Sequence, residues 1–585
     1  MKSFLVLKDF FIKNKWKYFF GVMWLIIIDI VQLIVPQILR IVTNLLQNNL
    51  LTFNELIKYS LYIILTGLII AVGRYYWRIY LQGTARTLEY YLRNKLFRHL
   101  LTLSTNYFNT HKTGDLMAHA TNDINSVRMA LGQGGVMIVD AVFMTFFSVI
   151  MMIHTTNLKL TLVAISTLPF IAIVVGKFGK IIHKRFIKVQ EAFSDLTDTA
   201  QENFAGIRVI KSFVQEENEI KKFSVVNNNN LSKNLSLVKI SGIFHPLVQF
   251  MSSISFLIVL WYGGILVIRD DISLGDFVAF NSYLSSMVWP MMATGWVINL
   301  FQRGAASMDR LNIIFEEKPE ITDSKDAIDI KNMKGEIEFK NVSFKYPHSE
   351  NYAVKNLNFK IPSDHSLAIV GRTGSGKSTI VSLLLRLYDI DEGEILIDGI
   401  NIKDMTIKSL RENIGYVPQE NFLFSDSIIN NIAFSFEEEE KYNEDLIYNA
   451  SRTAEVYDNI IEFPNKFETV LGERGVTLSG GQKQRVSIAR AIIKDSSVLI
   501  LDDSLSSVDT DTEERILSNL REVIKKRTTI IISHRISTIK DSDEILVIDE
   551  GEIVARGNHD SLVKQDGIYK DLYEKQLLEE KIQKN

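Results

Sequence analysis

Residues Gly371 to Thr379 read GRTGSGKST, and this stretch decides the fold of the C-terminal half of the chain. It fits the pattern G-x-x-x-x-G-K-[ST] of a P-loop. The apolar run Leu367 to Val370 precedes it and predicts a buried strand, and an apolar helical pattern begins at Ile380. A strand, a glycine loop and a helix are the context that this motif requires, so the chain is expected to bind a nucleoside triphosphate.

The loop supplies the groups that a polyphosphate needs. Its glycines let backbone N–H groups turn toward the phosphates, and the helix N-terminus adds positive potential. Lys377 is expected to reach the β- and γ-phosphates, and Ser378 to ligate Mg²⁺. The predicted nucleotide-binding residues here are Gly371, Arg372, Thr373, Gly374, Ser375, Gly376, Lys377, Ser378 and Thr379.

Composition separates two unlike halves. The 585 residues are too many for one core, and the net charge of −3 gives no sign of nucleic-acid binding. Without cysteine, disulfides, thiolate zinc sites and a cysteine nucleophile are excluded. All six tryptophans and the long apolar runs precede residue 300, which predicts a membrane domain followed by a soluble one.

Six stretches are long and apolar enough to cross a membrane, which takes about 20 residues each. The predicted spans are residues 18–39, 59–80, 136–155, 159–177, 244–267 and 277–300, the fourth being short. Basic residues gather before the first span and after the fourth: Lys2, Lys8, Lys13, Lys15 and Lys17, then Lys177, Lys180, Lys184, Arg185 and Lys188. By the positive-inside rule, both termini and the P-loop are expected to be cytoplasmic.

The connections at 81–135 and 178–243 are too long for unstructured loops and predict cytoplasmic extensions of the membrane helices. Each is expected to carry a short contact element at its tip, near Thr113 to Leu116 in the first and near Ala205 to Arg208 in the second.

Ionisable residues inside spans are expensive and therefore informative. Arg74 and Arg78 are one helical turn apart in the second span, and Asp140 enters the third at a similar depth, so an ion pair is plausible. Such a pair would stabilise helix packing. Asp29 and Gln32 in the first span would line a water-filled cavity or pair with a neighbouring helix.

The soluble half contains further nucleotide elements. Residues 316–334 are charged and polar and predict a linker, and the alternating residues 337–344 predict a strand. Val498 to Asp503 (VLILDD) is an apolar run that ends in two carboxylates, which predicts a buried parallel strand with Asp502 placed to hold Mg²⁺. Leu478 to Gln482 (LSGGQ) opens a helix whose N-terminus is a second anion site.

With LSGGQ, the residues resemble the ATP-binding cassette superfamily, whose signature sequence this is. The resemblance extends over nearly the whole chain and is to a half-transporter of the bacterial multidrug exporter type. It implies an all-α six-helix transmembrane domain (1–315), a linker (316–334) and an α/β P-loop NTPase cassette with a helical subdomain (335–585).

The resemblance also implies roles for particular residues. Tyr346 looks like the aromatic that stacks on adenine, and His534 like the switch histidine at the γ-phosphate. Gln419 looks like the Q-loop glutamine, which touches Mg²⁺ and the membrane domain. Ser506 to Asp509 resembles the D-loop, and Thr469 to Gly475 (TVLGERG) an element that touches the intracellular loops.

The family further implies a dimer that encloses two ATP molecules between its cassettes. The P-loop of one chain then faces the signature of the other, whose phosphate contacts would come from Ser479, Gly480, Gly481 and Gln482. ATP with Mg²⁺ would drive the membrane helices between inward- and outward-facing states.

One position departs from the family pattern. The second carboxylate of this strand end, presumed to polarise the attacking water, is usually glutamate, and here it is Asp503. Losing one methylene withdraws the carboxylate by roughly 1–1.5 Å, and a misplacement of about 1 Å costs on the order of a hundredfold in rate. Similar bacterial exporters with aspartate here are halves of heterodimers, so a slow site in a heterodimer is expected, with a homodimer as the alternative.

The function expected from these features is ATP-driven export of amphipathic drugs or lipids across the cytoplasmic membrane. A lipid flippase or a peptide exporter remains open, and so does an ATP-gated membrane protein with incidental hydrolysis. A soluble cassette ATPase is excluded by the six predicted spans, and an importer is disfavoured because importers usually carry the membrane domain on separate chains.

Overall fold

The computed structural model describes residues 2–166, 168–347, 349–436, 444–472, 475 and 478–583. It divides into two compact units. The first comprises Met1–Leu101 and Lys112–Glu317, and the second comprises Thr102–His111 and Lys318–Asn585.

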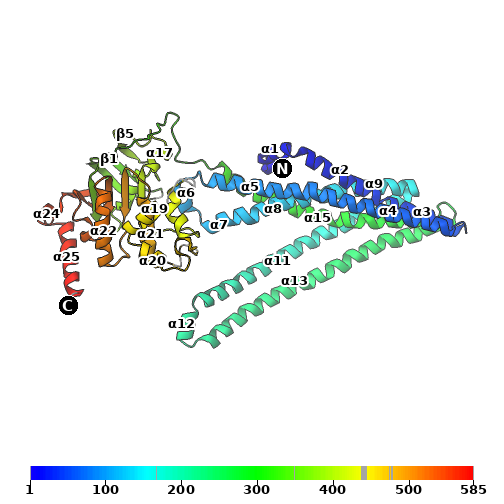
Figure 1. Ribbon diagram of the computed structural model, residues 1–585. Helices are drawn as coiled ribbons and strands as arrows, with labels where there is room; N and C mark the ends of the chain where they lie inside the picture. The colour runs from blue at the N-terminus through cyan, green and yellow to red at the C-terminus, as the bar shows by residue number, and fades with distance from the viewer. Residues whose placement is uncertain are drawn as a thin grey trace. The chain divides into compact units, whose positions relative to one another are not determined.

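The first unit is helical throughout its described elements (Figure 1). Its N-terminal elements are η1 (Lys2–Leu7), α1 (Lys8–Lys13), α2 (Lys15–Gln32), α3 (Ile34–Gln47), α4 (Phe53–Trp77), η2 (Arg78–Gln82) and α5 (Gly83–Leu100). The central ones are α7 (Thr113–Ala118), η3 (His119–Asp123), α8 (Ile124–Met129), η4 (Ala130–Gly134), α9 (Gly135–Thr155) and α10 (Leu158–Ile165). The last are α11 (Leu168–Ala205), α12 (Ile207–Ser212), α13 (Glu216–Ile258), η5 (Val259–Gly263), α14 (Gly264–Ile268) and α15 (Leu274–Glu316).

Four helical stretches in the described part are long and apolar enough to cross a membrane: Lys15–Gln47, Phe53–Leu100, Thr113–Thr155 and Glu216–Ile268. They contain the predicted spans 18–39, 59–80, 136–155 and 244–267. The predicted span 159–177 falls across α10 and α11, and 277–300 lies within α15. Side chains such as Asn281 and Ser282 lower the hydropathy of α15, although both bond to carbonyls one turn earlier in the helix. The count of six spans therefore stays a prediction.

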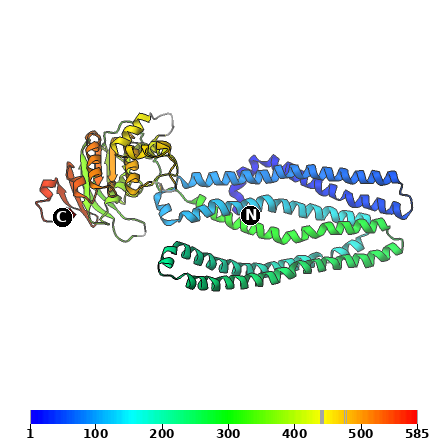
Figure 2. The same cartoon turned by 60° about the horizontal axis from the view of Figure 1, so that its bottom comes forward.

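The two long polar connections are helical, as predicted. The antiparallel helices α11 and α13 run side by side in both views, and α12 lies at their tip, where Gly206 precedes it (Figures 1 and 2). In the first connection, the expected contact element near Thr113 to Leu116 belongs to α7 in the first unit, and its contact with the cassette stays a prediction. Helix α6 (Thr105–Thr110), just before it in the chain, belongs to the second unit.

The second unit contains two sheets. Their strands are β1 (Ile337–Phe344), β2 (Val354–Ile361), β3 (Ser366–Gly371), β4 (Glu392–Ile397), β5 (Ile400–Asn401), β6 (Ile414–Val417), β7 (Val498–Asp502), β8 (Thr528–Ile532), β9 (Glu544–Asp549) and β10 (Glu552–Gly557). The antiparallel sheet has the order β2-β1-β4-β5, and the larger sheet has the order β10-β9-β3-β8-β7-β6. In the larger sheet, β9, β3, β8, β7 and β6 are mutually parallel.

The parallel strands are buried on both faces. Ala368 and Val370 of β3 belong to one apolar cluster, and their neighbours Leu367 and Ile369 belong to another. This explains why the strand sequences are continuously apolar rather than alternating. Helices α19 and α21 pack together in the second unit (Figure 1). The helices are α16 (Lys377–Leu384), α17 (Ile407–Glu412), α18 (Ile428–Ile432), η6 (Ala433–Ser435), α19 (Glu444–Thr453), α20 (Tyr457–Ile461), η8 (Lys466–Glu468), α21 (Gly480–Ile492), α22 (Thr510–Ile524), α23 (Ile536–Ile539), α24 (His559–Leu562) and α25 (Ile568–Gln583).

The predicted linker 316–334 is attached to the cassette by backbone hydrogen bonds. The Ile328 N–H donates to the Asp404 carbonyl at 2.7 Å, and the Ile328 carbonyl accepts from the Thr406 N–H at 3.0 Å. The Lys334 N–H donates to the Asp398 carboxylate at 2.7 Å. From Lys318 onward these residues belong to the second unit.

Candidate functional site

The nucleotide motifs meet at the carboxyl ends of three adjacent parallel strands, β3, β8 and β7. Ile532 of β8 pairs with Ile369 of β3 on one side and with Asp502 of β7 on the other. The P-loop follows β3, Asp503 follows β7, and His534 lies two residues beyond β8. This edge is where open parallel sheets bind ligands.

The side chain of Lys377 bonds back to the backbone of the P-loop. Lys377 is 7% exposed, and its Nζ donates to the carbonyls of Gly371 at 3.0 Å and Arg372 at 2.8 Å. Burial lowers the pKa of the Lys377 ammonium, and the charges of Asp502 and Asp503 oppose that shift. The lysine is therefore held at the loop as a buried cation.

The conformation of the loop requires glycine at several positions, and the loop contains a buried hydroxyl without a described partner. Gly374 and Gly376 have φ of +82° and +97°, which an L side chain rarely adopts, and a Cβ on Gly371 would lie 2.0 Å from the Ile548 carbonyl oxygen. The Oγ of Ser375 is buried and has no hydrogen-bond partner among the described residues. An unsatisfied buried hydroxyl in a loop of this shape fits a phosphate group.

Oxygen ligands for a hard cation lie beside the loop. The Ser378 hydroxyl donates to an Asp502 carboxylate oxygen at 3.2 Å. Burial raises the pKa of the Asp502 carboxyl, the bond from Ser378 opposes this, and the charge of Asp503 adds to it. No group of three or more His, Asp or Glu side chains able to hold a metal occurs in the described part of the chain. A hydroxyl and one carboxylate suit Mg²⁺ that arrives with phosphates rather than in an all-protein cage.

Asp503 and His534 complete the charged cluster. Asp503 has φ of +47°, and its N–H donates to the Ile532 carbonyl at 2.8 Å. Burial lowers the pKa of the His534 imidazole, the charge of Lys377 lowers it further, and Asp503 opposes both effects. The ring is therefore neutral at pH 7.

Tyr346 stands at the P-loop. Its hydroxyl lies 3.1 Å from the Thr379 hydroxyl, and its ring meets the ring of Tyr388 edge-on with centroids 5.2 Å apart. No sequence motif pointed to Tyr388. It is partly buried beside Tyr346 and accepts a hydrogen bond from Asn109 of α6.

The signature residues cap their own helix. Ser479 and Gln482 form a reciprocal capping box at the start of α21, with N···O distances of 2.9 and 3.3 Å. The structure describes no hydrogen bond from residues 479–482 to the P-loop of the same chain. The two segments expected to bind phosphate are therefore not joined to each other by any described hydrogen bond.

Two further residues organise the D-loop. The buried Gln484 amide donates to the Ser506 hydroxyl at 3.0 Å and accepts from the Ser507 N–H at 2.9 Å. Arg535 donates to the carbonyls of Ser506 and Val508, both at 3.2 Å. Gln484 follows LSGGQ by two residues, and Arg535 directly follows His534. This proximity to a motif was the one sequence signal that could have pointed to them.

Gln419 and the element Thr469 to Gly475 make few described contacts with the other predicted site residues. Gln419 follows β6 by two residues, at the same sheet edge as Asp502, but its side chain is exposed and makes no hydrogen bond to the described residues. Within Thr469 to Gly475, the Leu471 N–H donates to the Asp426 carbonyl at 2.9 Å. Glu473 and Arg474 of this element lie outside the described residues.

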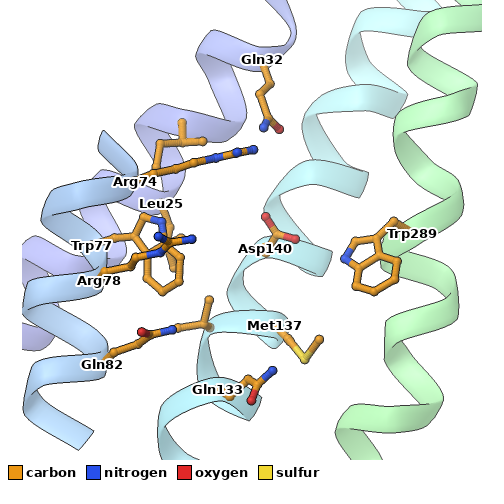
Figure 3. A pocket seen from close by; sticks show the side chains of 12 residues that line it. Leu25, Gln32, Arg74, Trp77, Arg78, Gln82, Gln133, Met137, Asp140 and Trp289 are labelled. Atoms are coloured by element: carbon orange, nitrogen blue, oxygen red, sulfur yellow. The ribbon is translucent and has the colours of Figure 1, made fainter. Parts of the chain in front are cut away.

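The first unit contains its own polar cavity (Figure 3). Arg74, Arg78 and Asp140 all line it, but no ion pair within 4.0 Å joins these side chains in the described structure. Gln32 also lines this cavity, which was one of the two alternatives expected for the polar residues of the first span. Asp29 does not; it is 1% exposed, and its carboxyl lies against that of Asp140.

Fold and site together define an ATPase cassette carried on the same chain as a helical membrane domain. The "ABC transporter transmembrane region" family matches residues 18–291, and the "ABC transporter" family matches residues 354–506. The chain belongs to the ABC transporter family. It is an ATP-hydrolysing, membrane-embedded exporter, and exporters of this family function as dimers.

The chain is similar to named proteins over most of its length. It is 38% identical to the probable multidrug resistance ABC transporter ATP-binding/permease protein YheI of Bacillus subtilis, covering 98% of each chain. It is 39% identical to an ATP-dependent lipid A-core flippase of Haemophilus influenzae, covering 83% of this chain and 82% of that one. A solved bacterial Atm1-family ABC exporter with ATP bound matches 96% of this chain and 98% of its own, with a TM-score of 0.79 and 26% identity.

Proposed function

We propose that this chain exports amphipathic compounds, drugs or lipids, as the weakly hydrolysing half of a heterodimeric transporter. Its partner is a second half-transporter in the cytoplasmic membrane, and both termini and the cassette face the cytoplasm. The relatives named for multidrug resistance support the class of compound.

The observation that carries the proposal is Asp503. It occupies the position after β7 that faces the same sheet edge as Lys377 and His534, and its charge acts on both. A carboxylate one methylene shorter than glutamate holds the attacking water about 1 Å from its productive position, which costs on the order of a hundredfold in rate. This site therefore binds ATP well and hydrolyses it slowly.

The two separate phosphate elements support a shared site. Residues 371–379 and Ser479 to Gln482 of one chain make no described bond to each other, so each is free to face a complementary element on a second chain. The intact signature of this chain would complete the P-loop site of its partner, and the partner would supply the faster site. ATP bound between the cassettes favours the closed dimer and biases the membrane helices toward the outward-facing state.

Each residue then has a task. Tyr346 stacks on adenine, Lys377 and the loop N–H groups hold the phosphates, and neutral His534 donates a hydrogen bond toward the γ-phosphate. Ser378, Asp502 and Gln419 would hold Mg²⁺. That ion, when bound, neutralises charge that develops on the transferred phosphoryl group.

A homodimeric lipid flippase is the second candidate. It is favoured by the 37–39% identity to three relatives named lipid A-core flippases. In this case aspartate at 503 suffices for catalysis, and the two sites are equal.

ATP turnover by this chain alone in lipid separates the candidates. We expect turnover near background for the wild type and no further loss in Asp503→Asn, because a poorly placed carboxylate contributes little. Asp503→Glu should restore turnover by roughly one to two orders of magnitude, as the missing reach is regained. Co-expression with a half-transporter that carries glutamate at this position should restore turnover to the wild type.

The opposite pattern identifies the homodimer. Robust turnover by the wild-type chain alone, abolished in Asp503→Asn, would overturn the slow-site assignment. Uptake of a fluorescent drug and of a labelled lipid into inverted vesicles then shows which class is exported.

A further inference from the structure

The polar cavity of the first unit is built by four segments far apart in the sequence. Helices α2 and α3, the α4–η2 region, the η4–α9 region and α15 contribute its walls (Figure 3). It has two adjoining parts of about 300 and 540 Å³, which share Gln32, Arg74, Asp140 and Trp289. Ligand sites for small molecules fall in this size range.

The formal charge of the lining is positive. Arg74 and Arg78 contribute two positive charges and Asp140 one negative charge, and no other lining residue of either part is charged. Figure 3 shows both guanidinium groups extending from their helix toward the cavity, with Asp140 on the facing helix. Neither arginine has a hydrogen bond or ion pair to any described residue, so its donors are available to a ligand.

Unpaired arginines are costly at membrane depth unless they serve a ligand or a water-filled path. A guanidinium presents five N–H donors in a planar fork that matches carboxylate and phosphate groups. Apolar side chains also line the cavity: Trp289 projects into it from α15, and Trp77 and Met137 line its wall. The cavity thus combines guanidinium donors for an anion with a neighbouring apolar surface.

We infer that this cavity binds amphiphiles with an anionic head group, which Arg74 and Arg78 hold while the apolar body lies against Trp289 and Trp77. The inference rests on the proposed export function and specifies its substrate class. A cationic amphiphile would have Asp140 as its sole lining carboxylate and would face two arginines. Asp29 lies against the Asp140 carboxyl but lines neither part of the cavity, so a ligand would meet Asp140 alone.

Binding is measured on nucleotide-free full-length protein in phosphatidylcholine nanodiscs, with empty discs as background. The probes are dodecyl phosphate, dodecyltrimethylammonium and inorganic phosphate. We expect saturable binding of dodecyl phosphate alone. The double variant R74Q/R78Q should weaken it by roughly 10- to 100-fold, the loss expected for charge-assisted hydrogen bonds.

Three further variants guard against a folding artefact. R74K/R78K keeps both charges but loses the planar forks, so its affinity should fall between that of the wild type and that of the glutamine pair. Asp140→Asn removes the opposing charge and should leave binding equal or tighter. Arg269→Gln removes an exposed arginine outside the cavity and should change nothing.

The result that overturns the inference is equal or tighter binding of dodecyltrimethylammonium, or dodecyl phosphate binding that R74Q/R78Q leaves unchanged. Binding of inorganic phosphate as tight as that of dodecyl phosphate would also overturn it, because the site would then recognise a free anion. A failure of the export proposal would give a different result from a failure of this inference. Arginine-dependent binding without stimulated ATP turnover or transport in the assembled dimer leaves this site in place and refutes export.

Discussion

The side-chain amide of Asn109 donates a hydrogen bond to the Tyr388 hydroxyl at 2.6 Å. Tyr388 in turn meets Tyr346 edge-on, and Tyr346 contacts Thr379 at the end of the P-loop. Helix α6, which carries Asn109, continues the chain from α5 of the membrane domain. An unbroken series of contacts therefore joins this helix to the residue expected to stack on adenine.

Breaking that series should uncouple transport from hydrolysis. We expect Tyr388→Phe, which removes the hydroxyl and keeps the ring, to leave basal ATP turnover of the assembled dimer within about twofold. Stimulation by a transported compound should fall several-fold, because one net hydrogen bond is worth about 1 kcal/mol. The measurement is turnover with and without the compound.

Tyr448→Phe is the matched control, since its hydroxyl bonds to Glu444 at 2.7 Å on the cassette surface. Equal loss of stimulation in both variants would contradict a role for the Asn109 contact.

The two signature glycines should differ in what they tolerate. A Cβ on Gly481 would lie 2.9 Å from the Ser507 carbonyl oxygen, whereas a Cβ on Gly480 would meet Ser507 no closer than 3.7 Å. Gly481→Ala should lower the stability of the protein by about 1–3 kcal/mol, as overpacking does. Gly480→Ala should melt like the wild type, and equal melting curves for both variants would refute this geometry.

Gln484 should act on turnover rather than on ATP binding. Gln484→Ala leaves the Ser507 N–H without its partner, at a cost of about 1–3 kcal/mol, and releases the D-loop. A fluorescent ATP analogue should bind as before while turnover of the assembled dimer falls. Asn519→Ala, which removes an exposed amide bonded to Glu455, serves as control and should change neither.

The pH dependence should reflect His534. Burial and the charge of Lys377 lower the pKa of this imidazole, so its neutral form persists to lower pH than for an ordinary histidine. In the Asp503→Glu chain, whose own site is expected to turn over, the acidic loss of kcat/KM, which reports the free enzyme, should therefore have its midpoint below about pH 6.5. The His534 substitution is made in this same background. His534→Gln cannot titrate and should lose this limb. A midpoint above the ordinary value that disappears in His534→Gln would contradict the pKa direction.

The sequence alone determined the class of the protein and most of its nucleotide site. The P-loop, LSGGQ and the VLILDD strand end are each formed by consecutive residues, so their local conformation follows from glycine placement, capping and burial. Parallel pairing of β3, β8 and β7 then brings their ends to one edge without further information. The sequence also showed that Asp503 departs from the family pattern, because aspartate and the usual glutamate differ by one methylene group.

Tertiary packing decided what lies between motifs. Helix α6 belongs to the same compact unit as the cassette, and its Asn109 bonds to Tyr388 across 279 residues of sequence. Gln484 reaches the D-loop only because α21 packs beside it. The spacing of Arg74, Arg78 and Asp140 suggested an ion pair, but helix separation places these charges across a cavity. Side-chain contacts between distant segments depend on helix rotation and spacing, which local sequence patterns do not encode.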